Sequence, residues 1–510
     1  MPRYAAIDIG SNSVRMMAAE VLPGRPMETL AADREVTRLG LSVFRQGAVS
    51  RESMDFLCRA LERMVAAYRK LDVVAVRAVA TAAVRDASNQ EEFLDRVSRT
   101  IGSPVEIISG TEEARLIHLG VETRWAHPNK TILIVDIGGG SAEIILSASG
   151  RMAEAFSQPL GSVRLTEAFL KHDPPTALEL HQMEEYIEEK LAGPARRIGG
   201  RPCDRVIATS ATPAALVCAV NRVPRARREK ADRLRATAAQ LRKLYRDLSQ
   251  RDLARRRKVT GIGPRRAEII VPGAAVLSRV LDDFRLPSLY YSVAGVRDGI
   301  IADLSARGVG RELTELSREQ RQVVEQMAHR YGISLKHTRK VAALAHTLFE
   351  SLAPLHKLPP YYGKLLEAGA HLHDIGHFVG DPGHHRHAQY IVVNSDMPGF
   401  TDQERSMIGN LCRHHRKSVP GSRHEQFQVM RAEERRAILL LIPLLRLADS
   451  LDRTHDQRVE SLECQVRDAN VVIYLRSTAD TDLDQWAGER VAEVFEQVYE
   501  RPLAVVRARR

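Results

Sequence analysis

The chain has 510 residues, of which 44% are hydrophobic and 27% charged, a balance that predicts an ordinary globular protein of three or four domains and excludes a disordered chain. Its net charge of +11 favours a polyanionic partner, and nucleic acid, polyphosphate and anionic lipid all qualify. Aromatic residues make up only 5% of the chain, so the stacking surfaces that bind single-stranded nucleic acid are scarce, and we expect no specific nucleic-acid partner.

The cysteines and the apolar segments indicate the compartment. The cysteines are scattered, odd in number and without disulfide or metal-ligand spacing: Cys58, Cys203, Cys218, Cys412 and Cys464. This usage fits a reducing environment. A strand that begins by Tyr4 leaves no room for a signal peptide, and no apolar run approaches the length of a membrane span. We therefore expect a cytoplasmic protein with no membrane partner.

One turn occurs twice in the sequence. The apolar run Tyr4–Ile7 leads into Asp8 and a Gly/Ser turn, and the run Thr131–Val135 leads into Asp136 and a second such turn. The turn residues are Gly10, Ser11, Asn12 and Ser13 in the first copy, and Gly138, Gly139, Gly140 and Ser141 in the second. An apolar run bounded by glycine predicts a buried strand. The turn brings N–H groups and hydroxyls to an anion, and the Asp can hold a metal ion or its water.

The two copies lie about 128 residues apart, which predicts a duplicated domain whose halves face each other across a cleft. A phosphate chain with a divalent cation would suit that cleft. Two tight hairpins without a ligand are the alternative, but the repetition of both Asp and Ser favours the binding site. We expect one α/β lobe over residues 1–123 and a second over residues 124–305.

Other elements follow in each lobe. The first lobe is predicted to contain a helix over 51–71, a strand over 73–79 and a helix leaving Glu112. The second is predicted to contain, within residues 206–212, a strand that ends in a small, hydroxyl-rich turn. Arg-rich stretches at 225–235 and 251–266 have two interpretations: an electrostatic guide for a polyanion, or a solvated helix face with interspersed acids.

The last 200 residues change pattern. From 306 to 454 helical periodicity dominates, with helices predicted at residues 318–331, 336–352, 361–373, 401–413 and 431–451. Residues 455–510 are predicted to form a small α+β cap, with a strand at 470–475, one helix at 484–499 and a short strand at 502–507.

Histidines and aspartates recur through these helices. His373 and Asp374 are adjacent, His337 lies one predicted helix upstream and Asp449 lies downstream. His, His-Asp and Asp in this order resemble the metal site of HD phosphohydrolases, in which imidazoles and carboxylates from separate helices converge on a divalent ion. By this resemblance we expect an HD-type domain with a second divalent metal. Further histidines could extend the site to two metals: His385, His387, His414 and His415.

Three motifs point to one family. They are Asp8 to Ser13, reading D-x-G-S-N-S, Ser109 to Leu116, reading S-G-x-E-E-A-R-L, and Asp136 to Glu143, reading D-I-G-G-G-S-x-E. In this order and spacing the chain resembles the exopolyphosphatase/guanosine pentaphosphatase (Ppx/GppA) family, in its long form. The resemblance implies two actin-like lobes of the ribonuclease H-like class. The departures are Ala211, where the family usually has glycine, and Ala294, where it often has Asp.

The resemblance also implies residue roles. Glu113, the second Glu of E-E-A-R, is the expected base that deprotonates the attacking water, with Glu112 as the alternative. Asp136 and Glu143 are expected to hold Mg²⁺ or Mn²⁺, with a share for Asp8. Arg85 is expected to reach the transferred phosphoryl group.

The implied activity is release of terminal phosphate from inorganic polyphosphate by Mg-dependent hydrolysis. The sister activity, on the 5′-phosphate of guanosine pentaphosphate (pppGpp), remains open because the same chemistry serves both. An actin-fold kinase would need an adenosine-binding glycine turn that the sequence does not show, and a non-catalytic nucleotide or alarmone sensor would not need Glu113 and Asp136. We also expect a homodimer.

Overall fold

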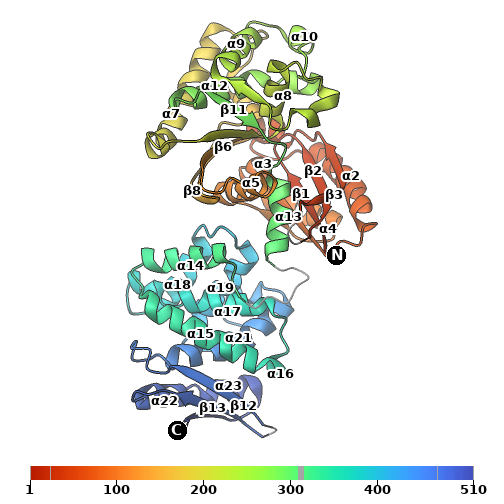
Figure 1. Cartoon of the computed structure of the whole chain (residues 1–510). Helices are drawn as coiled ribbons and strands as arrows, with labels where there is room; N and C mark the ends of the chain where they lie inside the picture. The colour runs from red at the N-terminus through yellow and green to blue at the C-terminus, as the bar shows by residue number, and fades with distance from the viewer. Residues whose placement is uncertain (1, 23–24, 308–314, 468, 509–510) are drawn as a thin grey trace. The chain divides into compact units, whose positions relative to one another are not determined.

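The computed structural model describes residues 2–22, 25–307, 315–467 and 469–508. The chain divides into two compact units, Met1–Gly310 and Arg311–Arg510, and each is described by itself (Figure 1).

The first unit is built on two mixed sheets. The strands of the first sheet are β1 (Arg3–Ile9), β2 (Val14–Glu20), β3 (Glu28–Glu35), β4 (Ala75–Ala80) and β5 (Val105–Ile107). Those of the second are β6 (Thr131–Ile137), β7 (Ala142–Ala148), β8 (Arg151–Gln158), β9 (Arg205–Thr209), β10 (Arg235–Thr237) and β11 (Ser288–Tyr291).

The two sheets share one topology. In the order β3-β2-β1-β4-β5, three antiparallel strands are followed by two strands parallel to β1. The second sheet repeats this as β8-β7-β6-β9-β11, with β10 added antiparallel at the edge. The duplication inferred from the two turns is therefore present in the whole strand order.

Helices connect and cover these sheets. They are α1 (Leu39–Gln46), α2 (Arg51–Arg69), α3 (Ala82–Arg85), α4 (Gln90–Ile101), α5 (Gly110–Arg124), α6 (Ser162–Phe169), α7 (Ala177–Ile198), α8 (Ala211–Val220), η1 (Arg225–Ala231), α9 (Ala238–Ser249), α10 (Leu253–Arg256), α11 (Pro264–Ala267), α12 (Ile270–Asp283) and α13 (Val296–Ala306). The strands predicted from Tyr4, at 73–79 and from Thr131 are confirmed to within two residues, and the segment 206–212 contains most of β9 and the turn that follows it.

Helices α5 and α13 pack tightly against each other. A Cβ on Gly299 would lie 1.8 Å from the carbonyl oxygen of Leu116, so the two backbones meet without room for a side chain. Although α13 falls within the predicted second lobe, its Ile300 and Ile301 share a core with Tyr4 of β1. The chain thus returns to the first sheet before the first unit ends.

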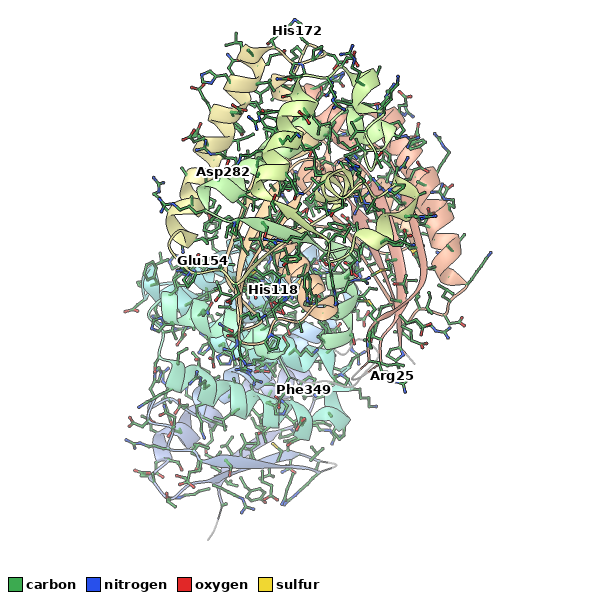
Figure 2. The ribbon with its side chains drawn as sticks, turned by 45° about the horizontal axis from the view of Figure 1, so that its top comes forward. Arg25, His118, Glu154, His172, Asp282 and Phe349 are labelled. Carbon is green, nitrogen blue, oxygen red and sulfur yellow. The ribbon has the colours of Figure 1, made fainter. Side chains whose placement is uncertain are left out.

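The second unit is mostly helical. Its helices are α14 (Arg318–Arg330), α15 (Leu335–Ser351), α16 (Ala353–His356), α17 (Tyr361–Leu372), η2 (Ile375–Phe378), α18 (His384–Asn394), α19 (Asp402–His414), α20 (Glu425–Gln428), α21 (Ala432–Ser450), α22 (Asp482–Glu489) and α23 (Ala492–Tyr499). They enclose one large apolar core, to which Phe349, labelled in Figure 2, belongs. The helices expected between residues 318 and 451 are confirmed.

A three-stranded sheet completes this unit, in the order β12 (Ser461–Val466), β13 (Val471–Arg476) and β14 (Leu503–Arg507). Strand β12 was missed because most of its side chains are exposed or polar. The single helix expected at 484–499 is wrong: α22 ends at Glu489 and α23 begins at Ala492, and between them the N–H of Val491 donates to the Gly488 carbonyl in a turn. Glycine is a poor helix former, which favours a break there. Among the described residues no helix is long and apolar enough to cross a membrane.

Candidate active site

The two repeated turns have the same geometry. The N–H of Gly10 donates to the carbonyl of Ser13 at 3.2 Å, and the N–H of Gly138 donates to that of Ser141 at 3.0 Å. Each turn closes an antiparallel hairpin in the same register, β1 with β2 and β6 with β7.

The tips of the hairpins also touch each other. A Cβ on Gly139 would lie 3.1 Å from the backbone nitrogen of Asn12, and one on Gly140 would lie 2.5 Å from the Oγ of Ser11. The second turn therefore needs glycine for packing as well as for any approach to phosphate. The Oγ of Ser11 accepts a hydrogen bond from the N–H of Ala83, which fixes the first turn to α3.

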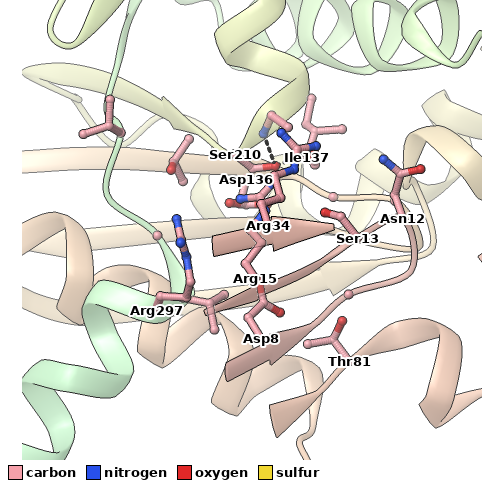
Figure 3. Close-up of a pocket in the computed structure, with 18 of the residues that line it drawn as sticks. Asp8, Asn12, Ser13, Arg15, Arg34, Thr81, Asp136, Ile137, Ser210 and Arg297 are labelled. Carbon is pink, nitrogen blue, oxygen red and sulfur yellow. Dashed lines mark hydrogen bonds between the residues drawn. The ribbon is translucent and has the colours of Figure 1, made fainter. Parts of the chain in front are cut away.

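A cavity of about 460 Å³ lies between the lobes (Figure 3). It brings together most of the residues predicted for the site: Asp8, Gly10, Ser11, Asn12, Ser13, Glu113, Asp136, Gly138, Gly139, Gly140 and Ser141. Glu143 and Arg85 lie beside this set rather than in the wall. Glu143 is fully buried, and Arg85 is partly exposed.

One row of side chains crosses the first sheet at the cavity. Asp8 of β1 is paired in register with Arg15 of β2, which is paired with Arg34 of β3. Directly paired residues on adjacent strands lie on the same face of a sheet. Figure 3 shows these three side chains gathered in the pocket. Burial raises the pKa of Asp8, while Arg15 and Arg297 act to lower it.

The corresponding row of the second sheet is acidic. Asp136 of β6 is paired with Glu143 of β7, which is paired with Ser157 of β8. The Ser157 hydroxyl donates to Glu143 Oε1 at 2.8 Å, whereas Glu143 Oε2 has no hydrogen-bond partner in the described part of the chain. Burial and the charge of Glu143 raise the pKa of Asp136 well above its usual range, and burial raises that of Glu143.

The third motif forms the start of α5. The Oγ of Ser109 caps the helix by accepting from the N–H of Glu112 at 3.1 Å. A Cβ on Gly110 would lie 2.3 Å from the Cβ of Ser157, so glycine lets the helix reach the second sheet beside Glu143.

The two adjacent glutamates of α5 have different surroundings. Glu112 belongs to a buried ion-pair network with Arg77 of β4, Arg115 of α5 and Asp303 of α13. Burial alone would raise the pKa of Glu112, but the contacts with Arg115 and Arg77 lower it to about 2. This glutamate joins three elements of the fold.

Glu113 faces the cavity instead. Its Oε2 has no hydrogen-bond partner among the described residues, and the Nη1 of Arg85 lies 3.6 Å away. That guanidinium is held by its donation to the carbonyl of Ile108 at 2.6 Å. Burial and the nearby charge of Glu143 raise the pKa of Glu113 well above its usual range. Of the two candidates for the base, the geometry favours Glu113.

The cavity also contains arginines that the motifs did not single out: Arg15, Arg34, Arg228, Arg266 and Arg297. In the part of the chain that the structure describes, none of the five has a carboxylate within ion-pair distance. Burial and the neighbouring guanidinium groups lower the pKa of Arg34 to about 9 and that of Arg266 well below its usual range. Such a group of uncompensated cations predicts an anionic ligand.

Two of these arginines come from the Arg-rich stretches that had two interpretations. Arg228 and Arg266 support the polyanion interpretation, whereas Arg255, which is 74% exposed, fits the solvated face. A run of arginines does not show by itself which members turn inward.

A second cavity, of about 420 Å³, shares walls with the first. Asn12, Arg34, Arg228 and Arg266 line both, and the second adds two arginines, Arg225 and Arg265, and one acid, Glu35. The described residues that line this second cavity include no aromatic side chain. Positive charge therefore continues beyond the space between the hairpins.

The turn after β9 shows why Ala211 can stand where the family usually has glycine. The positive φ of 78° falls on Ser210, whose hydroxyl donates to the carbonyl of Ile137 at 2.9 Å (Figure 3). Ala211 is the first residue of α8, where helical φ suits any residue. Ala294 is fully buried, and its carbonyl accepts from the hydroxyl of Thr209.

In the second unit the four residues predicted for a metal lie together. The Nε2 of His337 lies 3.5 Å and that of His373 lies 3.3 Å from Asp449 Oδ1, and Asp374 Oδ2 lies 3.5 Å from His373. Of the further histidines, only His415 reaches Asp374.

Among the described residues, the prediction that His385, His387 and His414 extend this site is wrong. His414 instead bonds through Nδ1 to the carbonyl of Ser418. His377 and His384 are found beside Asp374 in their place.

The strand order of the first unit and the two hairpins that meet over a cavity define an actin-like, two-lobed fold. Residues 17–307 match the Ppx/GppA phosphatase family, and residues 320–486 match domain III of the Ppx/GppA phosphatases. The chain belongs to this family and is a phosphatase.

Solved structures agree with this assignment. The Aquifex aeolicus PPX-GPPA enzyme is 30% identical, with a TM-score of 0.52, over 59% of this chain and 99% of that one. An exopolyphosphatase-like protein is 28% identical, with a TM-score of 0.56, over 59% and 97%. An exopolyphosphatase from Cytophaga hutchinsonii is 25% identical, with a TM-score of 0.55, over 59% and 97%.

Proposed function

We propose that this protein is an exopolyphosphatase, which hydrolyses the terminal phosphoanhydride bond of inorganic polyphosphate and releases orthophosphate. One observation carries the proposal: a single cavity combines buried carboxylates of raised pKa with five arginines that have no carboxylate partner among the described residues. A polyanion would compensate the arginines, and a divalent cation would compensate the carboxylates.

The donor set fits Mg²⁺ or Mn²⁺. Asp136 and Glu143 offer carboxylate oxygens, the ligands that hard divalent cations prefer, and Glu143 Oε2 has no hydrogen-bond partner among the described residues. Asp8 stands at the matching place of the first hairpin. When bound, the cation would neutralise charge on the phosphate oxygens.

The protein groups supply the remaining chemistry. The N–H groups and hydroxyls of the two turns would hold the terminal phosphoryl group, and positioning accounts for much of phosphoryl-transfer catalysis. Glu113 would take the proton of the attacking water, and its raised pKa makes it a stronger base than an exposed glutamate. Arg85 lies beside it and would offset charge that develops on the phosphoryl group.

The shape of the positive region favours polyphosphate over pppGpp. The second cavity continues the arginine lining, and its described lining offers no aromatic ring on which a guanine could stack. A uniform polyanion would use this whole path, whereas a nucleoside would use only part of it. The intact Glu113 argues against a sensor without catalysis.

The deciding experiment measures phosphate release from long-chain polyphosphate and from pppGpp, side by side, with and without Mg²⁺. We expect Mg-dependent release with a higher kcat/KM for polyphosphate. A higher kcat/KM for pppGpp would support the alternative, and no release from either substrate would refute the proposed activity.

A further inference from the structure

The His–Asp cluster of the second unit comprises His337, His373, Asp374, His377, His384, His415 and Asp449. Its residues come from α15, the ends of α17 and α19, η2, the start of α18, and α21. The cluster belongs to a different compact unit from the cleft, so it requires its own explanation.

Each of the five imidazoles is anchored through Nδ1. His337 bonds to Asp452 Oδ2 at 2.8 Å, and His377 to Asp381 Oδ1 at 2.6 Å. The other three bond to backbone carbonyls: His373 to Ala370 at 2.9 Å, His384 to Asp381 at 3.2 Å and His415 to Cys412 at 2.7 Å. An outer bond of this kind is what orients a metal-ligating histidine and leaves its second nitrogen for the ion.

The five Nε2 atoms all face carboxylates, but in the described part of the chain only that of His373 forms a hydrogen bond to one, at 3.3 Å from Asp449 Oδ1. The distances from Asp374 Oδ1 are 3.6 Å for His377, 3.6 Å for His384 and 3.7 Å for His415. The Nε2 of His337 is buried and has no hydrogen-bond partner among the described residues. The Nε2 atoms of His384 and His415 lie 3.3 Å apart, so both rings point at one place.

The two oxygens of Asp374 divide the cluster. Oδ2 lies on the side of His373, together with His337 and Asp449, while Oδ1 lies on the side of His377, His384 and His415. Two ligand groups are thereby formed, and Asp374 is common to both. The first offers two imidazoles and two carboxylates, and the second offers three imidazoles and one carboxylate.

We propose that this cluster binds two divalent transition-metal ions that share Asp374, and that the pair hydrolyses a phosphate ester. Imidazole with carboxylate is a donor set that suits transition metals, in contrast to the oxygen-only set of the cleft. His377 is 36% exposed, so the second ion is open to solvent and substrate. The exposed Arg416, whose Nη1 lies 3.4 Å from the His384 ring, provides a cation for the phosphate at this opening.

The chemistry needs one water. The oxygen of a metal-bound water, after loss of a proton to solvent, forms a bond to phosphorus, and the bond from phosphorus to the ester oxygen breaks. The leaving oxygen takes up a proton and departs as the alcohol. Each turnover consumes one water and gives one alcohol together with phosphate from a monoester, or with a phosphate monoester from a diester.

Metal analysis tests the binding. Full-length protein from Mn²⁺-supplemented cells, after gel filtration, should contain two equivalents of transition metal by elemental analysis. His337→Gln and His384→Gln should each lose one equivalent. His346→Gln, on the same helix as His337 but paired with the surface residue Glu350, should keep both. One equivalent or none in the wild-type protein would overturn the dinuclear site, as would equal metal content in all the variants.

Hydrolysis is tested in the Glu113→Gln background, so that the outcome does not depend on the cleft. This variant should release p-nitrophenol from p-nitrophenyl phosphate or its bis-ester with Mn²⁺, and adding Asp374→Asn should lower the rate ~10²-fold or more. A circular dichroism melt checks that the double variant is folded. No release by a protein that holds two metals, or release that Asp374→Asn leaves unchanged, would refute the second activity.

Discussion

The two lobes place the same hairpin on opposite sides of one cavity, but the side chains behind the hairpins differ. The row of the first lobe reads Asp8, Arg15 and Arg34, and that of the second reads Asp136, Glu143 and Ser157. In the duplicated frame, the row of the first lobe therefore carries two cations beside one carboxylate, whereas the row of the second carries two carboxylates and no cation. Duplication accounts for the shared strand order and for the aspartate on the first strand of each hairpin. The charges differ on the second and third strands of each sheet, β2 and β3 in the first lobe and β7 and β8 in the second.

Among the described residues, no charge in these rows has an ion-pair partner within bonding distance, which separates them from the network around Glu112. Burial lowers the pKa of Arg34, and burial with the charge of Glu143 raises that of Asp136 despite the opposing effect of Arg15. In the network of Glu112, by contrast, Arg77 and Arg115 compensate the carboxylate. We infer that buried charges without an ion-pair partner belong to the binding site, whereas buried charges in ion pairs hold the fold together.

The largest effect is expected for the cavity glutamate. Glu113→Gln should lower polyphosphate turnover by ~10²-fold or more, because a general base is lost. The melting temperature should stay the same or rise, since removing a buried carboxylate of raised pKa removes a destabilising charge. Steady-state kinetics and a thermal melt measure both, with the exposed Glu62→Gln as control. Near-normal turnover would exclude Glu113 as the base.

The neighbouring glutamate should show the opposite pattern. Glu112→Gln should lower the free energy of unfolding by about 3 kcal/mol, because it leaves the buried Arg77 and Arg115 partly uncompensated. Urea unfolding measures this loss, and turnover per folded molecule should change little. If both variants lost activity equally and stability equally, the distinction between site and scaffold would fail.

This network also predicts a dependence on pH. The pKa of Glu112 is lowered from 4.5 to about 2, so its stabilisation is complete above pH 4.5 and is lost as the pH falls toward 2. The difference in unfolding free energy between wild type and Glu112→Gln should shrink by about 2 kcal/mol from pH 6 to pH 3. A constant difference over this interval would contradict the lowered pKa.

A smaller effect is expected in the acidic row. Glu143→Gln should raise the Mg²⁺ concentration needed for half-maximal activity by about tenfold or more, because a charged ligand oxygen is lost. The measurement is a Mg²⁺ titration of phosphate release. Glu122→Gln, which lies on α5 away from the cavity lining, is the control, and an unchanged titration in Glu143→Gln would remove this residue from the metal site.

The smallest effect is expected in the basic row. Arg34→Gln should weaken long-chain polyphosphate binding by about tenfold, with a shallower salt dependence, because one charge-assisted contact is lost. Arg255→Gln is the matched control, since that arginine is 74% exposed and lines neither cavity. Equal affinity in both variants would show that the first row does not bind the chain.

Much of the site could be predicted because its motifs are local. The turns at Gly10 and Gly138 and the helix start at Ser109 depend on residues close together in sequence. Arg34 and Arg228 could not be found in this way. They reach the cavity from a third strand and a short 3-10 helix, and only the fold decides which arginines of the chain turn inward.

By itself, the sequence determined the two hairpins, the duplicated lobes, the helical second unit and the His-Asp quartet, because strand and helix periods and glycine turns are set within a few residues. Only the tertiary structure decided what depends on distant packing. It showed that Glu112 belongs to an ion-pair network whereas Glu113 faces the cavity. It also showed that α13 packs on the first sheet, and that His377 and His384, rather than three of the expected histidines, lie beside Asp374. Each of these outcomes rests on contacts between segments far apart in the chain, where charge and volume must be matched in three dimensions.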